Sequence, residues 1–280
     1  GRAEPEPGDA LERARQALAD LAEDVAERYR HLAQLELPVD VAVEGAELPP
    51  QPHPACVGAH GEDRGAGGPA RVLRDVRDRD QHVGVRSAGH ELYVVAPKRE
   101  QSWVGAAKSR NRPVHATAAD RGFGCPTWII DGTPSDGINI AVGHLLPRTL
   151  AIDAVISGIN VGLNASLGFI IASGTIAGAW EGALHGLPAI AFSQDLTTEV
   201  YDDLKTSGDV PDAALHAILK ISAQHAARLA PELAAATLPR SFIVHNVNFP
   251  LPCHEHTEVR RTVPARVVVP GLFSPAADDG

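Results

Sequence analysis

Three short polar loops carry the residues best suited to chemistry. Residues 157–164 (SGINVGLN) combine small residues, which let backbone N–H groups approach an anion, with amides that can offer an oxygen to a hard cation. Residues 172–176 (ASGTI) place hydroxyls and N–H groups at the start of an expected helix, where phosphate is favoured. Residues 96–102 (APKREQS) would project a hydroxyl and two basic groups over a sheet edge.

Each loop also has an ordinary explanation, as a turn for Ser102, a tight turn for 157–164 and a helix cap for Ser173. Three such loops at neighbouring strand ends are less easily explained as independent caps. The loop at 157–164 contains neither the GxGxxG pattern of dinucleotide folds nor the GxxxxGK[ST] pattern of a P-loop. These two kinds of site therefore lose support.

The elements that must position these loops begin at His90. From there short apolar runs alternate with helical patterns, which predicts βαβ units around a mainly parallel sheet. The expected strands are residues 91–96, 154–157, 189–192 and 242–247, and the expected helices are residues 135–146, 175–185 and 212–229. Ligands of open α/β sheets bind at the carboxyl ends of the strands, which is where the polar loops fall.

The chain before His90 has a different character. Apolar residues three and four apart predict an amphipathic helix from Asp9 to Leu37, which would pack on its own domain or pair with another helix. Residues 49–89 are rich in Gly, Pro, Arg, Asp, Ala and His and have little with which to build a core. We therefore expect a helix at 1–40, a linker or scrambled first strand at 41–88, and an α/β domain at 89–280 whose C-terminal part is incomplete.

Composition excludes several classes of function. A formal charge of -10 would repel the phosphate backbone of polymeric nucleic acid. The longest apolar runs are far shorter than the roughly 20 residues that span a bilayer, so no membrane association is expected. Three cysteines without a CxxC pair argue against a disulfide framework and a cysteine zinc site and favour the cytoplasm. The start at Gly1 and the absence of methionine suggest a fragment, a processed chain or an incomplete gene product.

The motifs between residues 89 and 253 occur in an order that resembles the SurE family. They are YVVAP (93–97) with REQS (99–102), GTPSD (132–136), SGIN (157–160), SGT (173–175) with EGA (181–183), GLPAIA (186–191) and NVNFP (246–250). The resemblance implies a Rossmann-like, three-layer α/β fold. It also implies a phosphoric monoester hydrolase, akin to acid phosphatases, that hydrolyses nucleoside 5′- or 3′-monophosphates with a divalent cation, Mn or Mg. Family members are homo-oligomers, so the resemblance implies that state too.

The resemblance also implies roles for particular residues. Ser102 and Asn160 match metal ligands of the family, and Asn164 matches the phosphate-facing region. The loop of Ser173, Gly174 and Thr175 matches the same phosphate-facing region.

One family motif is missing. Members open with a strand that runs into Asn-Asp-Asp-Gly, and this chain has RVLRDVRDRD at 71–80 instead. Asp78 and Asp80 would replace the acidic pair only if that strand formed differently, so we assign no catalytic carboxylate. Mg and Mn sites normally use carboxylates, which a hydroxyl and an amide do not supply. We therefore expect weak metal binding and impaired hydrolysis.

Two other functions stay open at this point. One is a binding module that holds phosphate or a nucleotide without turnover. A frame-corrected translation of the gene that restored Asn-Asp-Asp-Gly ahead of His90 would argue against it. The other is an assembly protein in which the helix from Asp9 to Leu37 associates and the α/β part is a scaffold.

Overall fold

The computed structural model describes residues 43–44, 71–75, 90–208, 210–238 and 240–266. The helix predicted from Asp9 to Leu37 lies outside the described residues, as do Asp78 and Asp80. No helix in the described part of the chain has the length and apolar character needed to cross a membrane.

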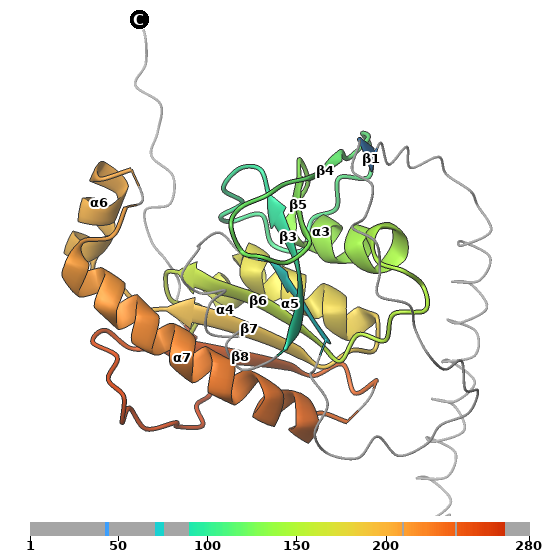
Figure 1. Ribbon diagram of the computed structural model, residues 1–280. Helices are drawn as coiled ribbons and strands as arrows, with labels where there is room; N and C mark the ends of the chain where they lie inside the picture. The colour runs from blue at the N-terminus through green and yellow to red at the C-terminus, as the bar shows by residue number, and fades with distance from the viewer. Residues whose placement is uncertain (1–42, 45–70, 76–89, 209, 239, 267–280) are drawn as a thin grey trace, which may run out of the picture. The chain divides into compact units, whose positions relative to one another are not determined.

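The described strands form one sheet in the order β1-β4-β5-β3-β2-β6-β7-β8 (Figure 1). Their bounds are β1 Val43–Glu44, β2 Arg71–Asp75, β3 Glu91–Pro97, β4 Ala116–Ala118, β5 Thr127–Ile130, β6 Ala154–Val161, β7 Ala189–Gln194 and β8 Val244–Phe249. Neighbouring strands are parallel, except that β4 pairs with β5 in the antiparallel direction. The predicted α/β class with a mainly parallel sheet is confirmed.

The expected strands correspond to β3, β6, β7 and β8. Every residue of β7 is buried, and five consecutive residues of β3 are buried, as continuous apolar runs in a parallel sheet require. β8 begins two residues later than expected, because Arg240 and Phe242 have left-handed backbone conformations (φ 58° and 55°) and the chain is still turning there.

β2 comes from the Arg-rich stretch that we interpreted as a linker or a scrambled strand. It lies at the centre of the sheet, with Arg71 opposite Glu91 of β3 and Asp75 opposite Ser157 of β6. The carboxyl end of β2 therefore meets the same sheet edge as those of β3 and β6.

Five α-helices and a π-helical turn are described. They are α3 Pro134–Ile140, continued by the π-helix η1 Ala141–Leu145, then α4 Leu167–Ala172, α5 Gly174–Leu184, α6 Thr198–Thr206 and α7 Ala213–Ala236. Asp212 caps α7, and Thr133 and Asp136 form a capping box on α3. The three expected helices are present, whereas the short helices α4 and α6 were not predicted.

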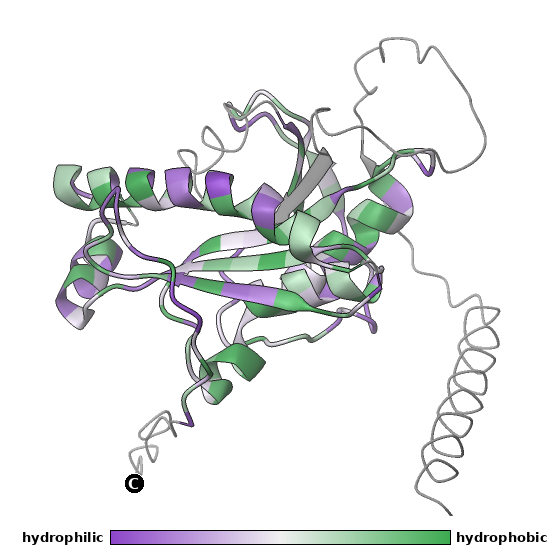
Figure 2. Ribbon diagram, turned by 90° about the horizontal axis from the view of Figure 1, so that it is seen from below, coloured by the Kyte–Doolittle hydropathy of each residue, from purple (hydrophilic) through white to green (hydrophobic). Residues whose placement is uncertain are grey.

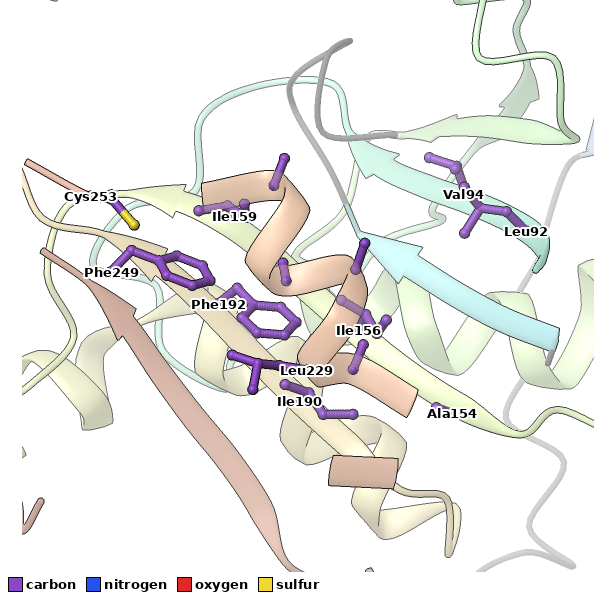
Figure 3. Packing of buried hydrophobic residues seen from close by; sticks show 14 residues of the cluster. Leu92, Val94, Ala154, Ile156, Ile159, Ile190, Phe192, Leu229, Phe249 and Cys253 are labelled. Carbon is purple, nitrogen blue, oxygen red and sulfur yellow. The ribbon is translucent and has the colours of Figure 1, made fainter. Parts of the chain in front are cut away.

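The helices cover both faces of the sheet, which gives three layers. Ile190 and Phe192 of β7 pack in a cluster with Leu229 of α7, and Figure 3 shows these side chains beneath that helix. Ala189 and Ala191 of the same strand pack with residues of α5 on the other face. Figure 2 shows α7 running across the sheet, with apolar and polar stretches along its length. Alternate residues of one buried strand thus serve two helical layers.

The tightest helix-to-sheet contact occurs at Gly182 of α5. A Cβ atom there would lie 2.5 Å from Cβ of Val155 on β6, which is too close for a side chain to be accommodated. We predict that Gly182→Ala lowers the free energy of unfolding by about 1–3 kcal/mol through overpacking.

Gly143→Ala is the matched control, because a Cβ atom at this helical position meets nothing within 4 Å. It should be neutral or stabilising, since alanine is the better helix former. Urea denaturation of both variants measures the difference, and equal effects would contradict the packing described here.

Candidate functional site

A pocket of about 320 Å³ lies at the carboxyl edge of the sheet. It is lined by the end of β6, by the loops that follow β3, β6 and β7, by α4 and the start of α5, and by one residue each of α3 and α6. All six residues predicted to bind metal or phosphate contribute to the lining, namely Ser102, Asn160, Asn164, Ser173, Gly174 and Thr175. Lys98 and Arg99, which were expected to project over this edge, are exposed and are not among the lining residues.

The Ser102 loop is fixed against the loop that opens α5. Gly105 N donates a hydrogen bond to Ala172 O at 2.8 Å. A Cβ atom on Gly174 would lie 2.9 Å from Gln101 O, so only glycine allows the two backbones to approach this closely. The sequence therefore brings the serine hydroxyl and the helix start together through backbone contacts.

Glu100 orients the Ser102 hydroxyl. Ser102 Oγ donates to Glu100 Oε1 at 2.6 Å, and Glu100 Oε2 forms an ion pair with Lys205 Nζ of α6 at 3.2 Å. Both side chains are more than a third exposed, so the ion pair contributes little stability. Its effect is to connect α6 to the loop that carries Ser102.

Asn160 lies where β6 leaves regular pairing with β7. The Gly158–Ile159 peptide is cis, and Gly158 has φ 101°. A Cβ atom on Gly158 would lie 2.2 Å from Phe192 O, so no other residue fits there. Asn160 Nδ2 donates to Gly162 O at 2.9 Å, which leaves Oδ1 as the atom of this side chain that can bind a cation.

Asn164 holds its loop to the neighbouring strands. Its backbone N–H donates to Asn248 Oδ1 at 2.8 Å, and its Nδ2 donates to Ser193 Oγ at 2.8 Å. Asn246 Nδ2 donates in turn to Asn164 O at 2.7 Å. These bonds give the buried Asn164 a positioning role, and direct contact with phosphate stays a prediction.

Ser173 caps α5 and so orients the helix start. Its Oγ accepts a hydrogen bond from Ile176 N at 3.2 Å. The N–H groups of the first turn, including those of Gly174 and Thr175, have no intrahelical carbonyl partner. Together with the positive end of the helix dipole, they form a local environment that attracts an anionic oxygen.

Asp195 and three aromatic residues are among the lining residues that sequence reasoning missed. Asp195 follows β7 directly, and its backbone N–H donates to Phe249 O at 2.8 Å. Trp103, Phe169 and Tyr201 supply aromatic rings. An acid directly after a buried apolar strand is a signal that was available for Asp195. Phe169 and Tyr201 carry no comparable signal, because α4 and α6 were not expected.

Trp103 has an unusual backbone. Its φ is 64°, in the left-handed region that costs a non-glycine residue about 1–2 kcal/mol. The side chain is 53% exposed, and its ring centroid lies 5.6 Å from that of Phe169 with an interplanar angle of 56°. The indole therefore contacts the α4 phenyl ring while much of its surface stays open.

The described residues do not complete a site for a hard cation. They contain no group of three or more His, Cys, Asp or Glu side chains able to hold a metal ion. Around the pocket they offer the hydroxyl of Ser102, the amide of Asn160 and the carboxylate of Asp195, whereas Mg and Mn sites normally gather several carboxylates. Ser157 Oγ, opposite Asp75 in the sheet register, is fully buried and has no hydrogen-bond partner among the described residues.

A polar cluster around the buried Glu181 connects α3 to α5. Glu181 of α5 pairs with Lys108, accepts a hydrogen bond from Asn139 Nδ2 at 2.7 Å and lies 3.6 Å from His185 Nε2. Burial raises the pKa of this carboxyl, whereas hydrogen bonds with His185, Lys108 and Asn139 lower it. The net effect is a pKa lowered to about 2.

This cluster predicts a pH dependence of stability. Because the folded pKa of Glu181 lies below the ordinary 4.5, its contribution is present above pH 4.5 and is lost as pH falls toward 2. Glu181→Gln should lower the free energy of unfolding by about 2 kcal/mol at neutral pH and flatten its fall below pH 4.5.

Glu232→Gln is the matched control, because Glu232 pairs with Arg228 at 3.6 Å with both side chains more than half exposed. It should change stability by less than about 0.5 kcal/mol. Urea denaturation at several pH values gives the comparison. Identical pH profiles for the parent and Glu181→Gln would show that Glu181 does not have this role.

Comparison with known proteins places these features in a family. The family model described as "Survival protein SurE" matches residues 69–268. A protein of Thermus thermophilus named "5'-nucleotidase SurE 1" is 41% identical over 175 residues, which is 60% of this chain and 59% of the relative. A "5'-nucleotidase SurE" of Gloeobacter violaceus is 35% identical over 165 residues, which is 58% of this chain and 55% of the relative.

The fold also matches a solved structure. The crystal structure of the SurE protein from Aquifex aeolicus matches with a TM-score of 0.52 and 26% sequence identity, over 66% of this chain and 67% of that chain. The chain spans less than two thirds of the length of the Thermus thermophilus and Gloeobacter violaceus proteins.

Proposed function

Because the chain belongs to the SurE family, we propose that it is a phosphomonoesterase-type protein that binds nucleoside 5′- or 3′-monophosphates and hydrolyses them weakly. The observation that carries the proposal is one pocket that collects a capped helix start, a serine hydroxyl and an asparagine amide at the carboxyl edge of a parallel sheet. This is the place where α/β proteins bind phosphorylated ligands.

The chain's own residues account for binding. A phosphate monoester is dianionic near neutral pH, and the first-turn N–H groups of α5 can donate to its oxygens. Gly174 and Gly158 have no side chain, so the backbone at these residues passes close to Gln101 O and Phe192 O, respectively. Asn164 and Ser173 keep the two loops in place through the bonds described above.

The described residues give less support to hydrolysis than to binding. Family resemblance implies a divalent cation, Mn or Mg, with Ser102 and Asn160 among its ligands. The described donor set does not fit a hard cation. We propose instead that turnover in this chain is slow because the acidic pair of the family is missing.

The alternative function is nucleotide binding without turnover. It is favoured by the absence, among the described residues, of a carboxylate cluster that would hold a cation. The two functions differ in one measurement, because both predict binding of a nucleoside monophosphate and only the first predicts release of inorganic phosphate.

Two further properties go with the proposal. We propose a homo-oligomer in the cytoplasm, from the family resemblance and from the few, unpaired cysteines. Analytical ultracentrifugation of the full chain tests the first property.

The site assignment predicts the effect of two substitutions. Asn160→Ala and Ser102→Ala should each lower Mn-supported phosphate release from nucleoside monophosphates at least tenfold, since each removes an oxygen from an already poor site. A tenfold loss corresponds to about 1.4 kcal/mol of transition-state stabilisation. Steady-state phosphate release over a panel of nucleoside monophosphates gives the values.

Asn111→Ala is the control, because Asn111 is exposed in the loop between β3 and β4 and does not line the pocket. It should behave as the parent does. If all three variants match the parent, the pocket is not the site of hydrolysis.

A further inference from the structure

The rim of the pocket is aromatic, although aromatic residues are scarce in this chain. Phe, Trp and Tyr make up 4% of the sequence, yet Trp103, Phe169 and Tyr201 all line this one pocket. Two of the three, Trp103 and Tyr201, are also among the large apolar side chains that stand exposed, at 53% and 36%. The rim is therefore a place where flat rings meet solvent beside a phosphate-attracting helix start.

Backbone contacts fix the position of Trp103. It follows Ser102 directly, and two residues later Gly105 N donates to Ala172 O at the end of α4. The same helix carries Phe169, whose ring supports the indole at a centroid distance of 5.6 Å. The tilt of 56° between the rings leaves indole surface uncovered.

The conformation of Trp103 suggests that the side chain is used. At φ 64° glycine would be unstrained, whereas tryptophan is strained and exposed. Neither burial nor backbone geometry therefore explains a tryptophan at this position. A strained residue at a pocket rim is reason to look for a function.

Tyr201 lies on α6, and an ion pair connects this helix to the loop that carries Ser102. Lys205 Nζ lies 5.5 Å from the centroid of the Tyr201 ring and 3.2 Å from Glu100 Oε2. The Glu100 side chain accepts from Ser102 Oγ. Tyr201 of α6 and Trp103 are thus tied to the same loop.

We propose that Trp103, backed by Phe169, stacks on the base of a bound nucleoside monophosphate and makes the pocket prefer nucleotides over phosphate esters without a base. The inference rests on the proposed function and names a residue that sets specificity. Every base has a flat face, so stacking on an aromatic side chain recognises nucleotides with little preference among bases.

Binding to the full chain tests the inference without requiring turnover. The probes are adenosine 5′-monophosphate and ribose 5-phosphate, which share the sugar phosphate and differ in the base. Calorimetric titration should show that Trp103→Ala weakens binding of the nucleotide about 10-fold, within the range for loss of one stacked base, and leaves ribose 5-phosphate unchanged. Trp103→Phe should retain most of the nucleotide affinity.

Phe242→Ala is the matched control. Phe242 is 54% exposed and has φ 55°, so it resembles Trp103 in exposure and backbone conformation, but it does not line the pocket. It should bind both probes as the parent does. The inference is overturned if Trp103→Ala weakens both probes equally or neither, or if it changes the sedimentation coefficient, which would place Trp103 between copies of the chain.

The outcomes separate this inference from the proposed function. Nucleotide binding that depends on Trp103 without phosphate release supports the inference and contradicts hydrolysis. Phosphate release with no difference between Trp103→Ala and the parent supports hydrolysis and overturns the inference. If the parent binds neither probe, both proposals are wrong.

Discussion

The site depends on direct contact between backbones at the carboxyl edge of the sheet. At Gly158 the chain passes so close to Phe192 O that a Cβ atom would lie 2.2 Å away, and at Gly174 it approaches Gln101 O in the same manner. Such contacts leave no room for side chains between the loops. They therefore bring hydroxyl, amide and N–H groups from distant parts of the sequence into one pocket of about 320 Å³.

The sheet behind these contacts sets where they occur. The carboxyl ends of the parallel strands lie at one edge of the sheet. β7 supplies apolar side chains to helices on both faces of the sheet. Gly182 of α5 brings that helix against Val155 of β6, and the capped start of α5 then faces the pocket. Core packing and the phosphate-attracting helix start are thus two consequences of one arrangement.

Much of this arrangement could be predicted from the sequence. The runs that form β3, β6 and β7 are apolar because both of their faces are buried, and the loops after β3 and β6 were recognisable as polar. β2 (RVLRD) could not be predicted, because charged residues flank its two aliphatic residues. Its place at the centre of the sheet depends on pairing with β3 and β6. Phe169 and Tyr201 reach the pocket on α4 and α6, two short helices that local patterns did not predict.

We propose that this pocket binds nucleotides, and the described residues lack the group of carboxylates that fast hydrolysis needs. The direct test is the variant Val76→Asn, Arg77→Asp, Arg79→Gly, which introduces Asn-Asp-Asp-Gly in the sequence immediately after β2. Mn-supported phosphate release from adenosine 5′-monophosphate should rise at least about 100-fold over the parent, because fixed charge at the reacting phosphoryl group contributes several kcal/mol. Rapid hydrolysis by the parent, with no gain in the variant, would contradict the account.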